Sequence, residues 1–187
     1  MKVITAPTEV LTVAEVADHL RLGGSPYPDE TLLESLITAA RQWVEDYLRR
    51  AIGAQTLEDT FASFGSIRLR PPVSAITSIY YKTSGVSTLL ASTEYDLMDD
   101  PDKGGVRPAY GKTWPSIDPV TDAVVVRYET GYTTGSPSDL PGPIRSAMLL
   151  VIGDLYENRE AQILGTIVTE NKTVKRLLSM SRLEMGI

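Results

Sequence analysis

The feature that most constrains the fold is an amphipathic pattern from Asp29 to about Ala51, which predicts one long helix. Charged residues complement the helix dipole, with acidic side chains in the first turns and Arg49 and Arg50 in the last. Gly53 is the predicted C-cap. A helix with one apolar face must cover it with another element, and we expect Trp43 to be buried there. The apolar positions recur at helical spacing, as Leu32, Leu33, Leu36, Ile37, Ala40, Trp43, Val44, Tyr47 and Leu48.

A second long helix is predicted from Pro143 to Glu160, because proline suits a first helical position and an apolar stripe follows. A shorter helix is predicted over residues 12–22. Thr12 and Glu15 have the spacing of a capping box, and Gly23 with its following glycine should stop this helix. We expect the second long helix to cover Trp43 with the stripe Ile144, Ala147, Met148, Val151, Ile152 and Leu155.

Between the two long helices, residues 55–132 change to short β-type runs separated by Gly, Pro, Ser and Asp. The segment 99–119 is too broken by turn residues to predict regular structure. The predicted fold class is therefore α+β, with two long and two shorter helices and a β-rich stretch between the long ones. The candidate strands are Gln55–Phe61, Ser66–Leu69, Ala75–Tyr81, Thr88–Leu90, Tyr95–Met98 and Ala123–Tyr132.

The C-terminal part differs from this core, which spans residues 1–160. Residues 161–168 read as a linker, and a last short helix is predicted from Asn171 to about Leu183. Residues 170–187 are basic within an acidic protein, so they could form a solvated helix face, a helix that folds back onto the chain's own core, or a docking tail that is mobile in the free protein. The docking hypothesis rests on Lys172, Lys175, Arg176, Leu177, Leu178, Arg182 and Met185.

Composition excludes several classes of function. The chain of 187 residues has no cysteine, which rules out disulfides, thiolate metal sites and cysteine nucleophiles. No apolar run reaches the roughly 18 residues of a membrane span, so we expect no membrane partner. The net charge is −6, so the surface as a whole should not attract DNA.

Motifs that suggest chemistry have plainer explanations. Gly111-Lys112-Thr113 is not a phosphate-binding loop, because Val106 stands where the motif needs its first glycine. The acidic run 99–102 is best explained as a solvated turn. His19 is the one histidine, and Glu157 with Glu160 reads as a charged helix end. We therefore expect no enzyme activity, no cofactor and no metal site.

Tyrosine is unusually frequent, with nine residues against two phenylalanines. Tyrosine is enriched at protein interfaces, although a small sheet could also use these side chains at its edge. The tyrosines predicted to contact a neighbouring subunit are Tyr80, Tyr81, Tyr95 and Tyr110.

The order of these features resembles the head–tail connector (adaptor, or head-completion) family of long-tailed phages and of phage-like gene transfer agents. The resemblance covers about residues 8–160. It is carried by 32–45, Gln55-Thr56, 67–81, 95–97, Gly111-Lys-Thr-Trp-Pro115, 123–132 and 143–160, which ends in Tyr-Glu-Asn-Arg-Glu.

The resemblance implies a helical bundle with a β-rich insertion between the long helices. It also implies a non-catalytic protein that forms a ring of about twelve subunits at the head–tail interface of the virion. Its implied partners are the portal protein and a tail-side completion or stopper protein, and DNA would pass through the channel without sequence-specific binding. The docking tail would then bind the portal. The alternatives are another tail-completion subunit, a monomeric binding module or, less favoured, an enzyme with an unrecognised site.

Overall fold

The computed structural model describes residues 1–27, 29–98, 104–132, 140–158 and 172–182. It confirms the α+β class. The chain divides into two compact units: a helical unit of residues 9–52 and 133–187, and a β unit of residues 1–8 and 53–132. Each unit is built from two stretches of the chain.

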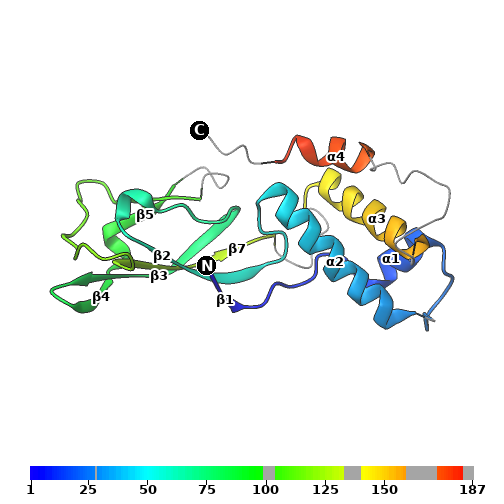
Figure 1. The fold of residues 1–187 in the computed structure, drawn as a ribbon, viewed down its shortest axis with the longest axis horizontal. Helices are drawn as coiled ribbons and strands as arrows, with labels where there is room; N and C mark the ends of the chain where they lie inside the picture. Colours follow the sequence, from blue (N-terminus) through cyan, green and yellow to red (C-terminus); the bar gives the residue numbers. More distant parts are fainter. Residues whose placement is uncertain (28, 99–103, 133–139, 159–171, 183–187) are drawn as a thin grey trace. The chain divides into compact units, whose positions relative to one another are not determined.

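The helical unit contains α1 (Val13–Leu20), α2 (Glu30–Leu48), α3 (Gly142–Glu157) and α4 (Lys172–Ser179). Helix α3 lies against α1, α2 and α4 (Figure 1). Its core is made where the apolar stripes meet: Val16, Ala17, Leu33, Ile37, Ala40, Val44, Leu48, Ile144, Ala147, Met148, Ile152, Val174 and Leu178 are all buried.

The predicted helix starts agree with the structure better than the predicted helix ends do. Thr12 caps α1 as predicted, since its hydroxyl accepts the backbone N–H of Glu15 at 3.2 Å. The predicted glycine caps are wrong: the C-cap of α1 is Arg21 and the C-cap of α2 is Arg49, both with φ of 59°. At Arg21 two backbone N–H groups bond back to α1 carbonyls, which stabilises this left-handed residue without a glycine.

The expected burial of Trp43 is also wrong, because its side chain is 42% exposed. The buried positions of α2 run through Ile37, Ala40 and Val44, so Trp43 lies on the flank of that stripe. Its ring stacks instead on Tyr47, with centroids 5.6 Å apart and planes 11° apart. An apolar residue next to a core position can thus continue the pattern without entering the core.

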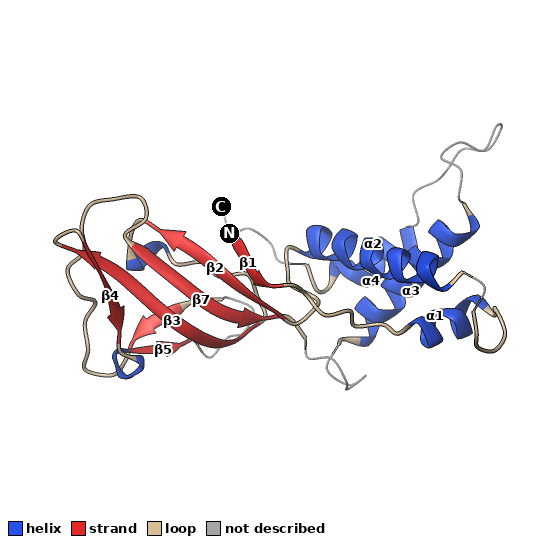
Figure 2. Cartoon of the chain, turned by 90° about the horizontal axis from the view of Figure 1, so that it is seen from below, coloured by secondary structure: helices blue, strands red, loops and turns tan. Residues whose placement is uncertain are grey.

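The β unit holds a five-stranded antiparallel sheet in the order β1-β2-β7-β3-β4 (Figure 2). Its strands are β1 (Lys2–Thr5), β2 (Gln55–Phe61), β3 (Val73–Thr83), β4 (Val86–Leu90) and β7 (Val124–Thr130).

A two-stranded hairpin adds β5 (Tyr95–Leu97) and β6 (Val106–Pro108). It lies over one face of the sheet (Figure 1).

Three strand predictions need correction. The segment 66–69 forms no strand, because a 3-10 turn at Phe64–Ser66 precedes it and buries Phe64. Strand β6 lies within the stretch considered too broken for regular structure. Strand β1 was not predicted either, and it comes from before α1. The β unit is therefore not only an insertion between the long helices.

One face of the sheet and the hairpin enclose the core of the β unit. Val124, Val126, Ile79 and Leu57 are buried there, and the Phe64 and Trp114 rings stack at 4.4 Å between centroids. Tyr128 is fully buried in the same core. Its hydroxyl accepts the N–H of Arg70 and donates to Asp59, so the polar group is satisfied. The core list is completed by Ile67, Leu69, Val73, Leu90, Val106 and Ala123.

Gly131 is required where β7 leaves the sheet. Its φ is +93°, and a side-chain Cβ there would lie 2.1 Å from the carbonyl oxygen of Gly53. Tyr132 then pairs with Gly53 in an isolated bridge. Only glycine allows this close backbone approach.

Candidate functional site

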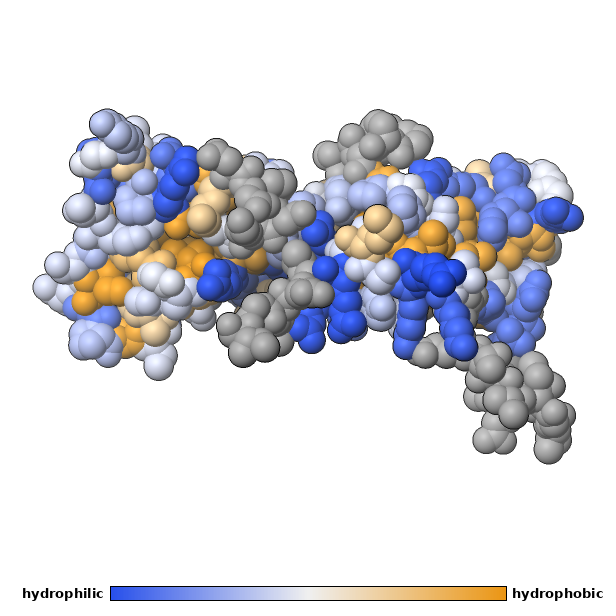
Figure 3. All heavy atoms as spheres, turned by 90° about the horizontal axis from the view of Figure 1, so that it is seen from above, coloured by the Kyte–Doolittle hydropathy of each residue, from blue (hydrophilic) through white to orange (hydrophobic). Residues whose placement is uncertain are grey.

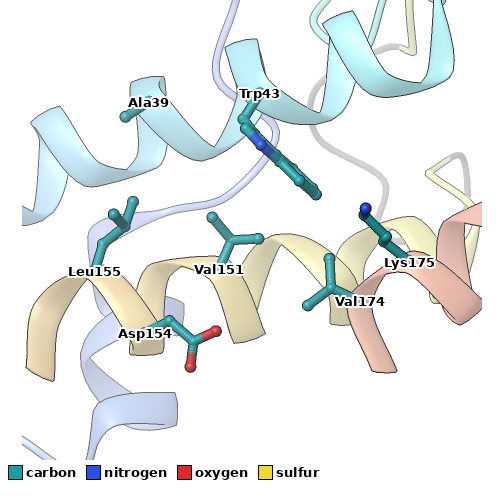
Figure 4. Close-up of a pocket in the computed structure, with 7 residues that line it drawn as sticks. All are labelled: Ala39, Trp43, Val151, Asp154, Leu155, Val174 and Lys175. Atoms are coloured by element: carbon teal, nitrogen blue, oxygen red, sulfur yellow. The ribbon is translucent and has the colours of Figure 1, made fainter. Parts of the chain in front are cut away.

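An apolar groove in the helical unit is one concave surface among the described residues that could hold a partner. It has a volume of about 410 Å³ and lies between α2, α3 and α4. In Figure 4 the side chains of Trp43, Val151 and Leu155 point into the gap between α2 and α3, and Lys175 of α4 points toward it. The partly exposed side chain of Trp43 therefore lines this groove. The lining residues are Ala39, Trp43, Val151, Asp154, Leu155, Val174 and Lys175.

Helix α4 forms one wall of this groove. It uses Val174 and Leu178 for the core of the helical unit, where both are buried. Lys172 and Arg176 are exposed on its other side. Strongly hydrophilic side chains border apolar ones on the face of the helical unit shown in Figure 3. The groove and α4 therefore offer apolar contacts with positive charge beside them.

Arg182 follows α4 and lies over the ring of Tyr47, with its guanidinium carbon 5.0 Å from the ring centroid. Because Tyr47 also stacks on Trp43, the three side chains form a short stack. A cation over an aromatic face contributes about 0.5–1 kcal/mol at exposed sites. This contact joins the end of α4 to α2 beside the groove.

The structure separates the residues predicted for docking. Lys172, Arg176 and Arg182 are exposed, and Lys175 lines the groove. Leu177 is half-buried, whereas Leu178 is fully buried and serves the chain's own core. Helix α4 packs on α3 in this structure, and the mobility expected of the tail in the free protein stays a prediction. Met185 and the predicted linker at 161–168 lie outside the described residues.

The four tyrosines predicted for a subunit interface also fall into two groups. Tyr80 is 41% exposed, and the side chain of Tyr110 is fully exposed. Tyr81 and Tyr95 instead pack against the core of the β unit. The pKa of Tyr95 is raised because burial disfavours its charged form. Tyr80 and Tyr110 are therefore the two that remain available to a neighbour.

A buried group of charges lies in the helical unit and was missed by the sequence patterns. Arg41 binds Glu9 through Nε at 2.9 Å and Glu45 through Nη1 at 3.2 Å. Glu45 also accepts the backbone N–H of Ile52 at 2.8 Å. Thr38 donates to Glu9 at 2.9 Å. These contacts hold the segments before and after α2 to that helix.

The residues considered for chemistry are not brought together. Lys112 binds Glu94 at 2.8 Å in a turn, and no helix follows it as a phosphate-binding loop would require. His19 lines a separate pocket of about 470 Å³ with Tyr156 and Glu157. The acidic run 99–102 and Glu160 lie outside the described residues. Among the residues that the structure describes, no three His, Asp or Glu side chains gather to hold a metal ion.

The described helices also include none with the length and apolarity of a membrane span.

Other perturbed groups belong to the β unit and are structural. Burial raises the pKa of Tyr128 well above its usual value, and its hydrogen bond to Asp59 acts in the same direction. The hydrogen bond from Lys82 lowers the pKa of Asp122 at the surface. Both groups have partners within the unit, so they stabilise the fold.

Comparison with known proteins finds matches among solved structures but none among sequences. No protein-family profile matches the sequence, and no curated protein sequence matches it. Solved structures do match. A chain from the virion of a native gene transfer agent particle is 26% identical, with a TM-score of 0.74 over 100% of this chain and 96% of that chain.

Two chains from particle necks are similar in the same way. One is from the neck of an empty gene transfer agent particle with C6 symmetry, at 23% identity and a TM-score of 0.74. The other is from the neck of a native particle with C12 symmetry, at 24% identity and a TM-score of 0.73. Both matches cover 100% of this chain and 98% of the other chain. The resemblance stated from the sequence is confirmed as a shared fold.

Proposed function

We propose that this chain is a structural head-to-tail connector in the neck of a gene transfer agent or tailed phage particle. The observation that carries the proposal is the full-length match, at a TM-score of 0.74, to chains from gene transfer agent particles, two of them from necks. The match extends over both units, so it is a likeness of the whole chain. The chain then works by binding and position, without chemistry.

In this role the protein forms a ring under the portal and continues the DNA channel toward the tail. The C6 and C12 symmetry of the related neck structures supports a cyclic arrangement. A ring needs two different surfaces on each subunit that fit each other. The net charge of −6 supports passage of DNA, because an acidic channel wall repels phosphates and does not retain the duplex.

The surface proposed to face the portal is α4 with its groove. Lys172 and Arg176 supply exposed positive charge, and the groove supplies apolar area from Trp43 and Leu155. This combination fits an acidic segment with a few apolar side chains. Leu178 is excluded from the docking set, because it is already buried within the chain.

The experiment that tests this function is capture of the protein by the portal of the same particle. Wild-type protein should bind the portal and appear as a ring by electron microscopy. The double variant Lys172→Glu/Arg176→Glu should bind at least about tenfold more weakly, since rim charges govern the approach of a partner. The matched control is Arg21→Glu/Arg68→Glu, which makes the same charge change at two exposed residues outside α4.

Each outcome has one meaning. Equal loss of portal binding in both double variants would reject α4 as the docking surface and leave a general charge effect. Failure of the wild-type protein to bind the portal or to form a ring would reject the connector function. A stable monomer that binds a different virion protein would support the alternative of a monomeric binding module.

A further inference from the structure

The sheet of the β unit ends in two open edges. Within the described part of the chain, β1 pairs only with β2, and β4 pairs only with β3. All four residues of β1 are exposed. Strand β4 reads Val-Ser-Thr-Leu-Leu and has neither a charge nor a proline. Soluble proteins usually protect an edge with such residues, so an unprotected edge marks a place where another strand pairs.

The hydrogen bonds of β3 show which groups of β4 point outward. Lys82 donates its backbone N–H to the carbonyl of Ala123 at 2.8 Å, and its own carbonyl accepts the N–H of Asp118 at 2.9 Å. Both backbone groups of Lys82 therefore point away from β4. Lys82 is opposite Ser87 in the register, and Tyr80 is opposite Leu89. Because bonded and non-bonded pairs alternate in an antiparallel ladder, Ser87 and Leu89 direct their N–H and C=O groups to the open edge.

Apolar side chains accompany both edges. On β4 and its turn, Leu89 is 56% exposed and Val86 is 62% exposed. Tyr80 lies beside Leu89 on the same face of the sheet, so exposed apolar surface continues from β4 onto β3. On β1, Val3 is 50% exposed. A strand that paired with β4 would therefore bury apolar area as well as satisfy backbone groups.

We propose that β4 of one copy pairs with β1 of the next copy, so that the sheets of neighbouring subunits join edge to edge. The inference rests on the proposed ring. Four antiparallel steps separate β1 from β4, so the two edges run in the same direction and the new pair is parallel. One copy offers β4 where the next offers β1, which is a head-to-tail contact that can close by rotation.

The first test removes one outward N–H of β4. Ser87→Pro deletes a donor that β3 does not use, whereas Ser87→Ala removes only the hydroxyl and keeps the donor. We expect Ser87→Pro to raise the protein concentration at half-assembly by about tenfold or more, and Ser87→Ala to assemble as wild type. Both should keep the wild-type melting temperature. Normal rings from Ser87→Pro, or equal loss in Ser87→Ala, would overturn the proposal.

A second test locates the contact without disturbing it. The chain has no cysteine, so the pair Lys2→Cys/Leu89→Cys can be joined by a short bis-maleimide without background. These positions share one face of the sheet through the ladder from β1 to β4. We expect assembled protein to give a ladder of linked multimers, and each single-cysteine variant to give none.

The two proposals fail differently in these tests. Wild-type rings that bind the portal, without linked multimers and with normal assembly of Ser87→Pro, would overturn the edge contact and keep the connector function. Linked multimers without portal binding would support the edge contact and count against the connector function. If wild-type protein gives no multimer even with the portal, both are overturned.

Discussion

At the scale of residues, charge and exposure depart from what the hydrophobic pattern predicts. Arg41 and Glu45 lie on the buried side of α2, while Trp43 between them is half-exposed. The ion pairs of Arg41 and the bond from Ile52 to Glu45 make this burial possible. Removing one member would leave a buried charge unpaired, which is more costly than the pair is stabilising.

The first prediction concerns Trp43. We expect Trp43→Ala to lower the free energy of unfolding by about 1–2 kcal/mol, because the side chain is only partly buried. Ile37→Ala, at a core position of the same helix, should cost about 2–5 kcal/mol. Urea denaturation followed by circular dichroism measures both. An equal or larger cost for Trp43→Ala would contradict the position of this side chain.

The second prediction concerns Tyr128 and pH. Removing the hydroxyl in Tyr128→Phe leaves the Arg70 N–H and Asp59 without this partner, and should cost about 1–3 kcal/mol at pH 7. Burial raises the pKa of Tyr128, so the folded state keeps the proton at a pH where the unfolded chain loses it. The stabilisation is therefore complete below about pH 10 and declines above it.

Denaturation at several pH values checks this sign. The stability difference between wild type and Tyr128→Phe should shrink from pH 9 to pH 11. Tyr110→Phe is the control, because the side chain of Tyr110 is fully exposed. A difference that stays constant with pH would show that the hydroxyl of Tyr128 titrates equally in both states.

At the scale of elements, α4 is a short helix that holds its place through a few contacts. A helix of 8 residues is marginal alone in water, so Val174 and Leu178 must supply much of its stability by packing on α3. Arg182 adds its contact with Tyr47. The basic character of α4 is consistent with this packing, because the exposed charges lie on the side away from the core.

The third prediction tests whether α4 belongs to the fold of the free protein. Leu178→Ala should lower the free energy of unfolding by about 2–5 kcal/mol, since the side chain is fully buried. Met180→Ala, two residues later, should change it by less than about 0.5 kcal/mol, because Met180 is 92% exposed. If Leu178→Ala keeps the wild-type melting temperature, α4 is detached in solution and the tail is a free docking segment.

At the scale of the whole molecule, the chain crosses three times between a helical unit and a β unit with separate cores. The acidic balance applies to the chain as a whole, with 24 acidic and 18 basic residues. Exposed positive charge on α4 is therefore a local exception.

The fourth prediction follows from this net charge. We expect no measurable binding of a DNA duplex at about 150 mM salt, because a protein of net charge −6 gains little from counterion release. Fluorescence anisotropy with a labelled duplex measures it, and Lys172→Glu/Arg176→Glu should give the same result. Binding that weakens steeply with salt and disappears in this variant would identify α4 as a DNA-binding surface.

The sequence by itself determined the α+β class, both long helices, the N-cap at Thr12 and most of the central strands. These elements follow from the spacing of apolar residues and from local capping, which are properties of neighbours in the chain. Strand β2, for example, has the same bounds in the prediction and in the structure.

Only the tertiary structure decided the rest, because it depends on residues far apart in the chain. Strand β1 forms by pairing with β2 more than 50 positions away, and Leu178 is buried because α3 covers it. Arg41 is buried because Glu9 and Glu45 neutralise it. The groove at Trp43 needs three helices, and the two open edges exist only once the strand order is known. Local spacing carries no record of these long-range partners, so no periodicity could have revealed them.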